Sequence, residues 1–220
     1  MNCYLCDQAL RYVPSWRGIF LYEIPEVLCR DCRSGFVRLD ATTGCRLCSK
    51  PGDSMCRDCL YWEAHGYQGL IESGTSLYSY NEAMKNWFHQ YKFLKDVVLA
   101  EVFASDLTDV LADERATVVP IPLHSGKLKE RSFSQVDQLL KASQIPYSHL
   151  LEKCGDTLGE KTRQQRIATK DLFRLNGESV PKSIVLVDDL YTTGTTMRHA
   201  AKALREGGAQ HIRMLTLIRA

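Results

Sequence analysis

Two segments of this sequence carry residues whose types and spacing could do chemistry. In the first, the apolar run Ile184–Val187 is followed directly by two aspartates, Asp188 and Asp189. Carboxylates at the end of a buried strand lie where open α/β sheets place their ligands. Such a pair can accept hydrogen bonds from vicinal sugar hydroxyls or bind a divalent cation. The two aspartates are therefore candidate catalytic residues.

A threonine-rich run after the aspartates predicts a phosphate site. Glycine in this run lets the backbone approach a ligand closely, and the start of the following helix offers free N–H groups and the positive end of its dipole. A plain turn with one threonine as helix cap explains only part of the run. No P-loop motif occurs in the chain. A ribose 5-phosphate would satisfy both the aspartates and the candidate phosphate-binding residues, which are Thr192, Thr193, Gly194, Thr195 and Thr196.

The second chemical segment is the N-terminal region, which holds eight of the nine cysteines in four Cys-x-x-Cys pairs. Two thiolates three residues apart form half of a tetrahedral site, and four soft thiolates select zinc. The pairs therefore predict two structural zinc ions with no position left for water. The candidate ligands are Cys3, Cys6, Cys29, Cys32, Cys45, Cys48, Cys56 and Cys59.

Four pairs can be combined into two sites in three ways. Sequential grouping closes loops of 22 and 7 residues and is preferred, because shorter loops cost less entropy, but an interleaved arrangement stays open. Redox Cys-x-x-Cys motifs open a helix in a βαβ pattern, whereas these pairs have short, polar, glycine-containing flanks. The ninth cysteine, Cys154, is expected to be an ordinary thiol.

The elements that must position these residues alternate along the C-terminal half. Strands are predicted over residues 117–122, 145–151, 183–187 and 212–218, with helices over 134–141 and 196–206. This alternation is typical of a parallel sheet covered on both faces. Residues 70–112 are predicted to be helical from apolar positions at 3.6-residue spacing. The aromatic residues there, with Lys85, Lys92 and Lys95, could form a nucleic-acid stripe, but a pair of core helices is preferred.

Charge and composition suggest how the 220 residues are organised. The net charge of +2 conceals −6 over residues 63–114 and +7 over residues 115–220. We expect a zinc module at 1–62 and a second domain at 63–220, made of a helical segment (63–114) and an α/β core (115–220). The apolar runs are too short for a membrane span, and the N-terminus lacks signal-peptide features. A cytoplasmic protein without a transmembrane segment is therefore expected.

The segment Val185–Thr196 resembles the phosphoribosyl-pyrophosphate (PRPP) motif of type I phosphoribosyltransferases. With the four cysteine pairs, Lys92-Phe93, and residues 119–124 and 127–135, nearly the whole chain resembles the ComF family, which acts in natural competence for DNA uptake. The resemblance implies an α/β fold: a type I phosphoribosyltransferase-like parallel sheet with helices on both faces, preceded by a small double zinc ribbon.

The resemblance also implies roles for individual residues. Asp188 and Asp189 would bind the ribose hydroxyls, and residues 192–196 the 5′-phosphate. The chain has Arg-Ser-Phe-Ser-Gln at 131–135 where the family usually has Arg-Gly-Phe-Asn-Gln, and the loop around 161–173 is altered. Both departures touch the diphosphate side, so ligand binding is predicted and catalysis is left open. Pyrophosphate and Mg²⁺ would lie beside Leu123, His124, Ser125, Lys161 and Arg163.

From these features we expect a competence protein that binds single-stranded DNA on its basic half and a ribose phosphate such as PRPP. The family resemblance implies cooperation with a ComFA-like helicase motor and recruitment to the uptake machinery at the membrane. One alternative is an active Mg²⁺-dependent phosphoribosyltransferase with an unknown acceptor. Another is a zinc-stabilised interaction module whose transferase fold is a relic.

Overall fold

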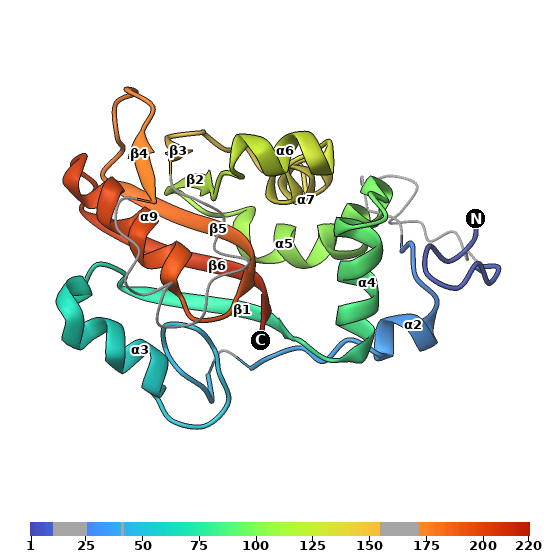
Figure 1. Ribbon diagram of the computed structural model, residues 1–220. Helices are drawn as coiled ribbons and strands as arrows, with labels where there is room; N and C mark the ends of the chain where they lie inside the picture. The colour runs from blue at the N-terminus through green and yellow to red at the C-terminus, as the bar shows by residue number, and fades with distance from the viewer. Residues whose placement is uncertain (11–25, 41, 155–171) are drawn as a thin grey trace.

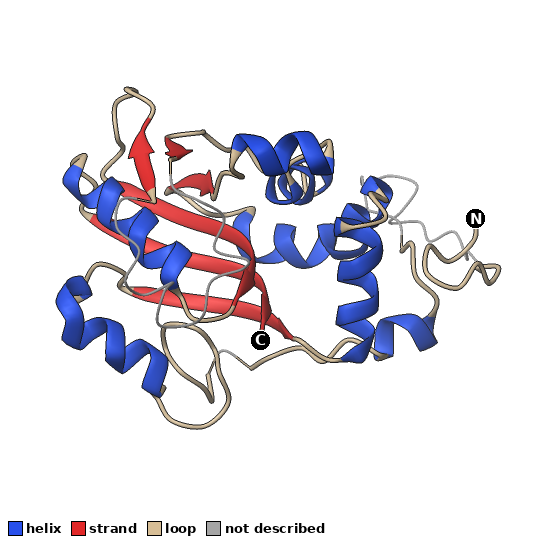
Figure 2. Ribbon diagram, in the orientation of Figure 1, coloured by secondary structure: helices blue, strands red, loops and turns tan. Residues whose placement is uncertain are grey.

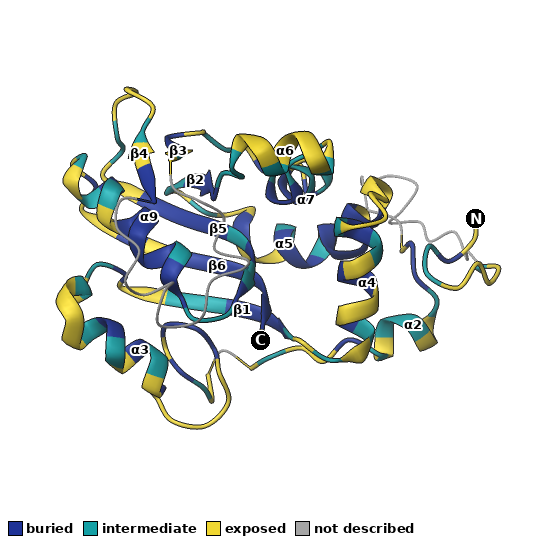
Figure 3. Ribbon diagram, in the orientation of Figure 1, coloured by how far each residue is buried: buried dark blue, intermediate teal, exposed yellow. Residues whose placement is uncertain are grey.

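A four-stranded parallel sheet lies at the centre of the protein (Figure 1). The computed structural model describes residues 1–10, 26–40, 42–154 and 172–220. Strands β5 and β6 are mostly buried (Figure 3), as expected for strands covered on both faces. Across the sheet the strands are β1 (Ser73–Ser79), β6 (His211–Arg219), β5 (Ser183–Tyr191) and β2 (Thr117–Pro120).

Helices cover both faces of this sheet (Figure 2). One face packs against α4 (Glu82–Lys92), the 3₁₀ helix η2 (Val97–Phe103), α5 (Ala104–Leu111) and α7 (Gln135–Ala142). The other face packs against α9 (Thr195–Glu206). No helix in the described ranges is long and apolar enough to cross a membrane. The shorter elements are α2 (Arg30–Ser34), α3 (Arg57–Trp62) with the π-turn η1 (Glu63–Tyr67), α6 (Ser125–Arg131), and the antiparallel pair β3 (Leu151–Lys153) and β4 (Phe173–Leu175).

Side-chain alternation along the strands produces two separate cores. Val185 and Val187 join the core under α4, α5 and α7, whereas Ile184 and Leu186 join the core under α9. The cysteine pairs divide between the same two cores. Cys3 belongs to the first core, and all four cysteines from residue 45 to residue 59 belong to the second.

The chain between the cysteine pairs also covers an edge of the sheet. The amide of Leu39 donates to the carbonyl of Leu77 at 2.8 Å, and the amide of Ser79 donates to that of Val37 at 2.9 Å. Residues 37–39 thus satisfy backbone groups that an edge strand would expose. The division of the chain into a zinc module at 1–62 and a second domain at 63–220 stays a prediction, and residues 37–39 of the first segment bond to β1 of the sheet.

Comparison with the expected elements gives confirmations and two corrections. The α/β class is confirmed, and the predicted helices at 134–141 and 196–206 correspond to α7 and α9. The helical prediction was wrong for Ser73–Ser79, which forms β1. This strand has few apolar residues, and a Cβ at Gly74 would collide with the carbonyl of Leu47 and with Met214. The predicted strand at 145–151 was also wrong, because the strand in this region is Leu151–Lys153, which pairs with β4.

Candidate functional site

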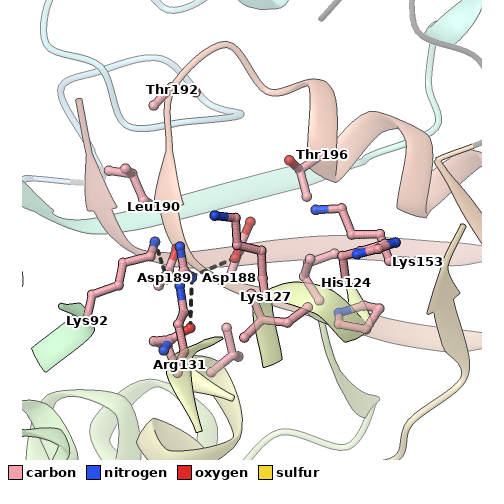
Figure 4. Close-up of a pocket in the computed structure, with 15 residues that line it drawn as sticks. Lys92, His124, Lys127, Arg131, Lys153, Asp188, Asp189, Leu190, Thr192 and Thr196 are labelled. Carbon is pink, nitrogen blue, oxygen red and sulfur yellow. Dashed lines mark hydrogen bonds and ion pairs between the residues drawn. The ribbon is translucent and has the colours of Figure 1, made fainter. Parts of the chain in front are cut away.

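A cavity of about 240 Å³ opens at the carboxyl ends of β2 and β5 (Figure 4). This is the edge where open parallel sheets bind ligands. The cavity combines residues from the two strand ends with residues from five other elements, namely α4, α6, α7, β3 and α9. Its lining residues are Lys92, Ile121, Pro122, Leu123, His124, Lys127, Arg131, Gln135, Val136, Lys153, Asp188, Asp189, Leu190, Thr192 and Thr196.

Two adjacent carboxylates lie at the centre of this cavity. Asp189 accepts a hydrogen bond from Lys92 Nζ at 3.2 Å, and both side chains are nearly buried, at 12% and 13% exposed. Asp188 Oδ1 accepts from the amide of Asp189 at 2.9 Å. Burial, and then the negative charge of Asp189, raise the pKa of Asp188 to about 7. The pair therefore offers acceptors, one of them ready to exchange a proton near neutral pH.

Cations surround the two carboxylates. Lys92, Lys127, Arg131 and Lys153 all line the cavity, so basic side chains outnumber acidic ones there. Burial lowers the pKa of Lys153, although the charges of Asp188 and Asp189 oppose that shift. Burial likewise lowers the pKa of Arg131. An anionic ligand would relieve this crowding of positive charge, so the electrostatics favour a phosphate-bearing molecule.

The loop between β5 and α9 has a backbone geometry that could hold a phosphate. Gly194 has a φ of 80°, and a Cβ there would collide with the hydroxyl of Tyr191, so the position requires glycine. No side chain caps the first turn of α9, which leaves its amide groups available to a ligand. The hydroxyls of Thr193 and Thr195 lie 2.9 Å apart, while Thr192 and Thr196 line the cavity.

Two groups of four cysteines lie outside this cavity. The first contains Cys3, Cys6, Cys29 and Cys32, and the second contains Cys45, Cys48, Cys56 and Cys59. Within each group all sulfur atoms lie within 4.8 Å of one another. The Sγ atoms of Cys6 and Cys29, and those of Cys48 and Cys56, are 3.6 Å apart. Sulfur atoms in a zinc tetrathiolate are about 3.8 Å apart, from a Zn–S bond of about 2.3 Å. The sequential grouping of the pairs is therefore confirmed.

Comparisons with known proteins cover both the cavity and the two cysteine groups. A family model described as a phosphoribosyl transferase domain matches residues 99–220. The competence protein ComFC of Streptococcus pneumoniae is 35% identical over 100% of both chains. The chain belongs to the ComF family. A second ComFC, from Bacillus subtilis, is 34% identical over 99% of this chain and 94% of its own.

Solved structures add a weaker likeness. A hypoxanthine phosphoribosyltransferase from Staphylococcus aureus is 13% identical and covers 56% of this chain and 62% of its own, with a TM-score of 0.34. A TM-score this low does not assign the fold of this ComF-family chain. The fold assignment rests instead on the family match and on the parallel sheet itself.

Most of the predicted site residues of this ComF-family protein gather around one cavity. Leu123 and His124 line it, and Ser125 opens α6 directly after them. His124 caps α6 by accepting from the amide of Gly126 at 3.3 Å. Lys161 and Arg163 lie outside the described residues, so their predicted place on the pyrophosphate side is not tested.

Sequence analysis missed several cavity residues. Lys92 was noted in a possible nucleic-acid stripe and in a family motif, but not as a site residue, and the stretch 127–135, which includes Arg131, was used only as a family motif. Lys153 gave no signal at all, because it lies on a three-residue strand with no recognisable pattern. Only the folded chain brings these cations to Asp188 and Asp189.

The second cysteine group has a charge environment that fits a zinc tetrathiolate. Among the described residues, four buried side-chain atoms have no hydrogen-bond partner: Glu63 Oε1, Arg219 Nε, and Nε and Nη2 of Arg198. Arg198 is buried, and its Nη1 lies 4.0 Å from Sδ of Met214, which belongs to the same core as the second group. Burial would lower the pKa of Arg219, but its interaction with Cys48 raises it. A doubly negative tetrathiolate would supply further counter-charge to the buried guanidinium group of Arg219. The residues therefore fit two structural zinc ions.

Proposed function

We propose that this protein acts in DNA uptake during natural competence, binding a ribose phosphate such as PRPP together with single-stranded DNA. The observation that carries the proposal is the cavity itself. Two carboxylates at the end of a central strand lie among four cations, and the glycine-containing start of a helix borders the same cavity. The relatives named competence proteins support the biological setting.

Each half of the cavity suits one part of a ribose phosphate. Asp188 and Asp189 would accept hydrogen bonds from the ribose hydroxyls, and the amides and hydroxyls of residues 192–196 would hold the 5′-phosphate. A diphosphate would lie near Leu123 and His124, where Lys127 and Lys153 can neutralise it. Mg²⁺ bound with PRPP would supply further charge neutralisation there.

A surface beside the cavity suits single-stranded DNA. Phe93 and Leu94 directly follow the cavity residue Lys92 and are 59% and 65% exposed. The ammonium group of Lys95 lies 3.4 Å from Ser132 Oγ, so this surface continues onto α6 with its basic residues. Exposed aromatic rings next to cations bind nucleic-acid bases and phosphates without sequence preference. The charge of +7 over residues 115–220 adds the electrostatic attraction.

Cooperation with a ComFA-like helicase motor, and recruitment to the membrane uptake machinery, belong to the same proposal. They rest on membership of the ComF family. An affinity measurement between the purified protein and the motor ATPase, with and without single-stranded DNA, tests them directly.

The ligand test is calorimetric titration with PRPP, with and without Mg²⁺. We expect saturable binding that Asp189→Asn weakens at least tenfold, because the variant loses the partner of Lys92 and an acceptor for ribose. Asp109→Asn, an exposed change on α5, serves as the matched control and should bind as wild type. Absence of binding by the wild-type protein would overturn the ribose-phosphate proposal.

The DNA test is fluorescence anisotropy with a single-stranded oligonucleotide between 50 and 200 mM salt. We expect affinity to fall steeply with salt, since released counterions drive such binding. Replacing Phe93 with Ala should weaken binding several-fold without changing the salt slope, because Phe93 contributes stacking and no charge. Binding that is absent at low salt would overturn the DNA role.

A second candidate is an active phosphoribosyltransferase, favoured by Lys127 and Lys153 at the predicted diphosphate side. An acceptor nucleophile would form a bond to ribose C1 as the C1–O bond to pyrophosphate breaks, and the leaving diphosphate would keep the electron pair. Cations positioned on that leaving group stabilise the transition state. Pyrophosphate release across candidate acceptors tests this. PRPP binding without release by any acceptor would favour the binding role.

A further inference from the structure

Helix α3 connects the second cysteine group to residues 192–196, the proposed phosphate site, which we call the phosphate loop. Cys56 and Cys59 occupy its N-cap and its first turn, and Trp62 is its last residue. The indole Nε1 of Trp62 donates to the carbonyl oxygen of Thr193 at 2.7 Å. Trp62 is almost fully buried, at 1% exposed. One short helix therefore carries two metal ligands and a hydrogen bond to the backbone of the phosphate loop.

A second contact runs through Tyr191, the last residue of β5. Its hydroxyl lies 3.5 Å from Cys59 Sγ, a distance at which the hydroxyl can donate to a thiolate. The same hydroxyl lies directly below Gly194, since any Cβ at that position would collide with it. Tyr191 thus fills the space between a metal ligand and the turn of the loop.

A third contact involves Arg219 at the end of β6. Its guanidinium group lies 3.5 Å from Asp58 of α3 and donates to the carbonyl of Tyr191 at 3.4 Å. Its charge also lies 5.0 Å from the centre of the Tyr191 ring. All three contacts are made by α3 residues 58–62. For the first cysteine group, no comparable contact with residues 191–196 is found in the part of the chain that the structure describes.

We propose that the second cysteine group is a positioning device for the phosphate loop, so that metal bound there sets the affinity of the cavity for a 5′-phosphate. The coupling acts through direct contacts between packed residues. Ligation of Cys56 and Cys59 fixes α3, and α3 fixes Tyr191, Thr193 and Gly194 through the contacts above. Preorganised amides bind a phosphate without the cost of ordering the loop on binding. This inference rests on the proposed ribose-phosphate site.

The binding test compares two matched tryptophan variants. Trp62→Phe removes the indole donor to Thr193 and keeps an aromatic ring. Trp87→Phe removes an equally buried indole donor, to the carbonyl of Leu99 at 3.1 Å, in the other core. Titration with ribose 5-phosphate should show at least a fivefold rise in Kd for Trp62→Phe and less than twofold for Trp87→Phe. Both should retain two zinc ions per chain. Equal Kd values for Trp62→Phe and wild type would overturn the proposal.

Hydrogen exchange tests the same coupling without any ligand. Amides of residues 193–197 should exchange at least tenfold faster in Trp62→Phe than in wild type. In Trp87→Phe their exchange rates should equal those of wild type. Cys45→Ser, which removes a metal ligand, should accelerate the same amides, whereas Cys154→Ser, outside both groups, should not. If wild type fails to bind ribose 5-phosphate, the proposed function falls while the exchange rates still decide the coupling. Wild-type exchange rates in Trp62→Phe would overturn it.

Discussion

The two cysteine groups have the same ligands and the same Cys-x-x-Cys spacing, yet their surroundings differ. All four cysteines of the second group are buried. In the first group Cys3 is buried, Cys29 and Cys32 are half-buried, and Cys6 is exposed. The first group therefore lies at the surface with one ligand open to water, and the second lies inside the core beneath α9. The same motif can therefore form a metal site at the surface or a metal site inside the core.

Their neighbours suggest different tasks. Around the first group, Tyr4 donates to Glu101 at 2.9 Å, and Arg33 pairs with Asp106 at 3.1 Å. These contacts fasten the N-terminal chain to the helical layer of η2 and α5. The second group instead contacts Tyr191 and, through α3, the phosphate loop. We infer that the first group stabilises the helices and the second supports the ligand site.

Removing one ligand from each group should give the largest contrast. Cys59→Ser should lose one zinc ion and lower the melting temperature by about 10–20 °C. This corresponds to roughly 5 kcal/mol for a metal lost from a core, at about 2–4 °C per kcal/mol. Cys6→Ser should cost less than half of that, because water can replace an exposed ligand. Thermal unfolding with zinc determination measures both.

Cys154→Ser controls for the loss of a thiol alone, since Cys154 is exposed and outside both groups. Its melting temperature should match wild type. Equal destabilisation by Cys59→Ser and Cys6→Ser would contradict the distinction between an internal and a peripheral site.

The ion pairs beside the first group should rank next. Asp106 is buried and accepts from Arg33, from Arg38 at 3.0 Å and from Tyr78 at 2.8 Å. Asp106→Asn should lower the unfolding free energy by about 2 kcal/mol, because both arginines lose their counter-charge. The loss of unfolding free energy should be no larger because the side chains of Arg33 and Arg38 are 30% and 51% exposed and water screens their charges. Urea unfolding measures it.

The matched control is Asp109→Asn on the same helix, where the side chain is exposed and the change should stay within about 0.5 kcal/mol. Asp106→Asn should also leave the Kd for ribose 5-phosphate at the wild-type value. A weakened Kd would show that the first group's side of the molecule controls the ligand site as well.

Local patterns allowed much of the fold and site to be predicted. The cysteine spacing indicated the two groups, and the apolar run before Asp188 indicated the central strand. Both signals lie within a few residues of one another. The strand β1 has no such signal, since most of its residues are small or polar and its position depends on Gly74 fitting between Leu47 and Met214. Tertiary packing decides that element.

The cavity residues that the sequence did not reveal also depend on tertiary packing. Lys92 pairs with Asp189 across 97 positions of sequence, and Lys153 comes from a strand of three residues. The division of the cysteine groups between two cores was likewise not foreseen, because the sequence suggested one zinc module at 1–62. Pairs this distant in sequence leave no periodic pattern to detect.

Charge compensation should sharpen the comparison further. Arg219 is buried, and its interaction with Cys48 of the second group raises the pKa of the arginine. Arg219→Met should weaken zinc binding at that group about 10–100-fold, the usual effect of losing an outer-shell partner. The first group should be unaffected. Competition with a chelator measures both affinities, and Lys202→Met, an exposed change on α9, is the control. Wild-type zinc affinity in Arg219→Met would exclude the arginine as counter-charge.

The last test concerns the pH dependence of the proposed ligand site. Asp188, whose pKa is about 7, faces Asp189, Lys92 and Lys153. Since this pKa lies above the unfolded value of about 3.9, the native state holds a proton that the unfolded chain has lost. Its contribution to stability is therefore present below pH 4 and is lost as the pH rises towards 7. Binding of the ribose hydroxyls requires the ionised carboxylate of Asp188, so the affinity for the ligand should increase as the pH rises.

The Kd for ribose 5-phosphate should consequently fall with rising pH, by at most about tenfold per unit below pH 7, and level off above it. The phosphate of the ligand also ionises near pH 6, so wild type alone cannot assign the effect. Asp188→Asn separates the two, because it should remove the part of the profile near pH 7 and keep the part near 6. A variant profile identical to wild type would place the titrating group elsewhere in the cavity. The same titration in Trp62→Phe should keep the wild-type pH profile at weaker affinity, since the loop and the carboxylates contact different parts of the ligand.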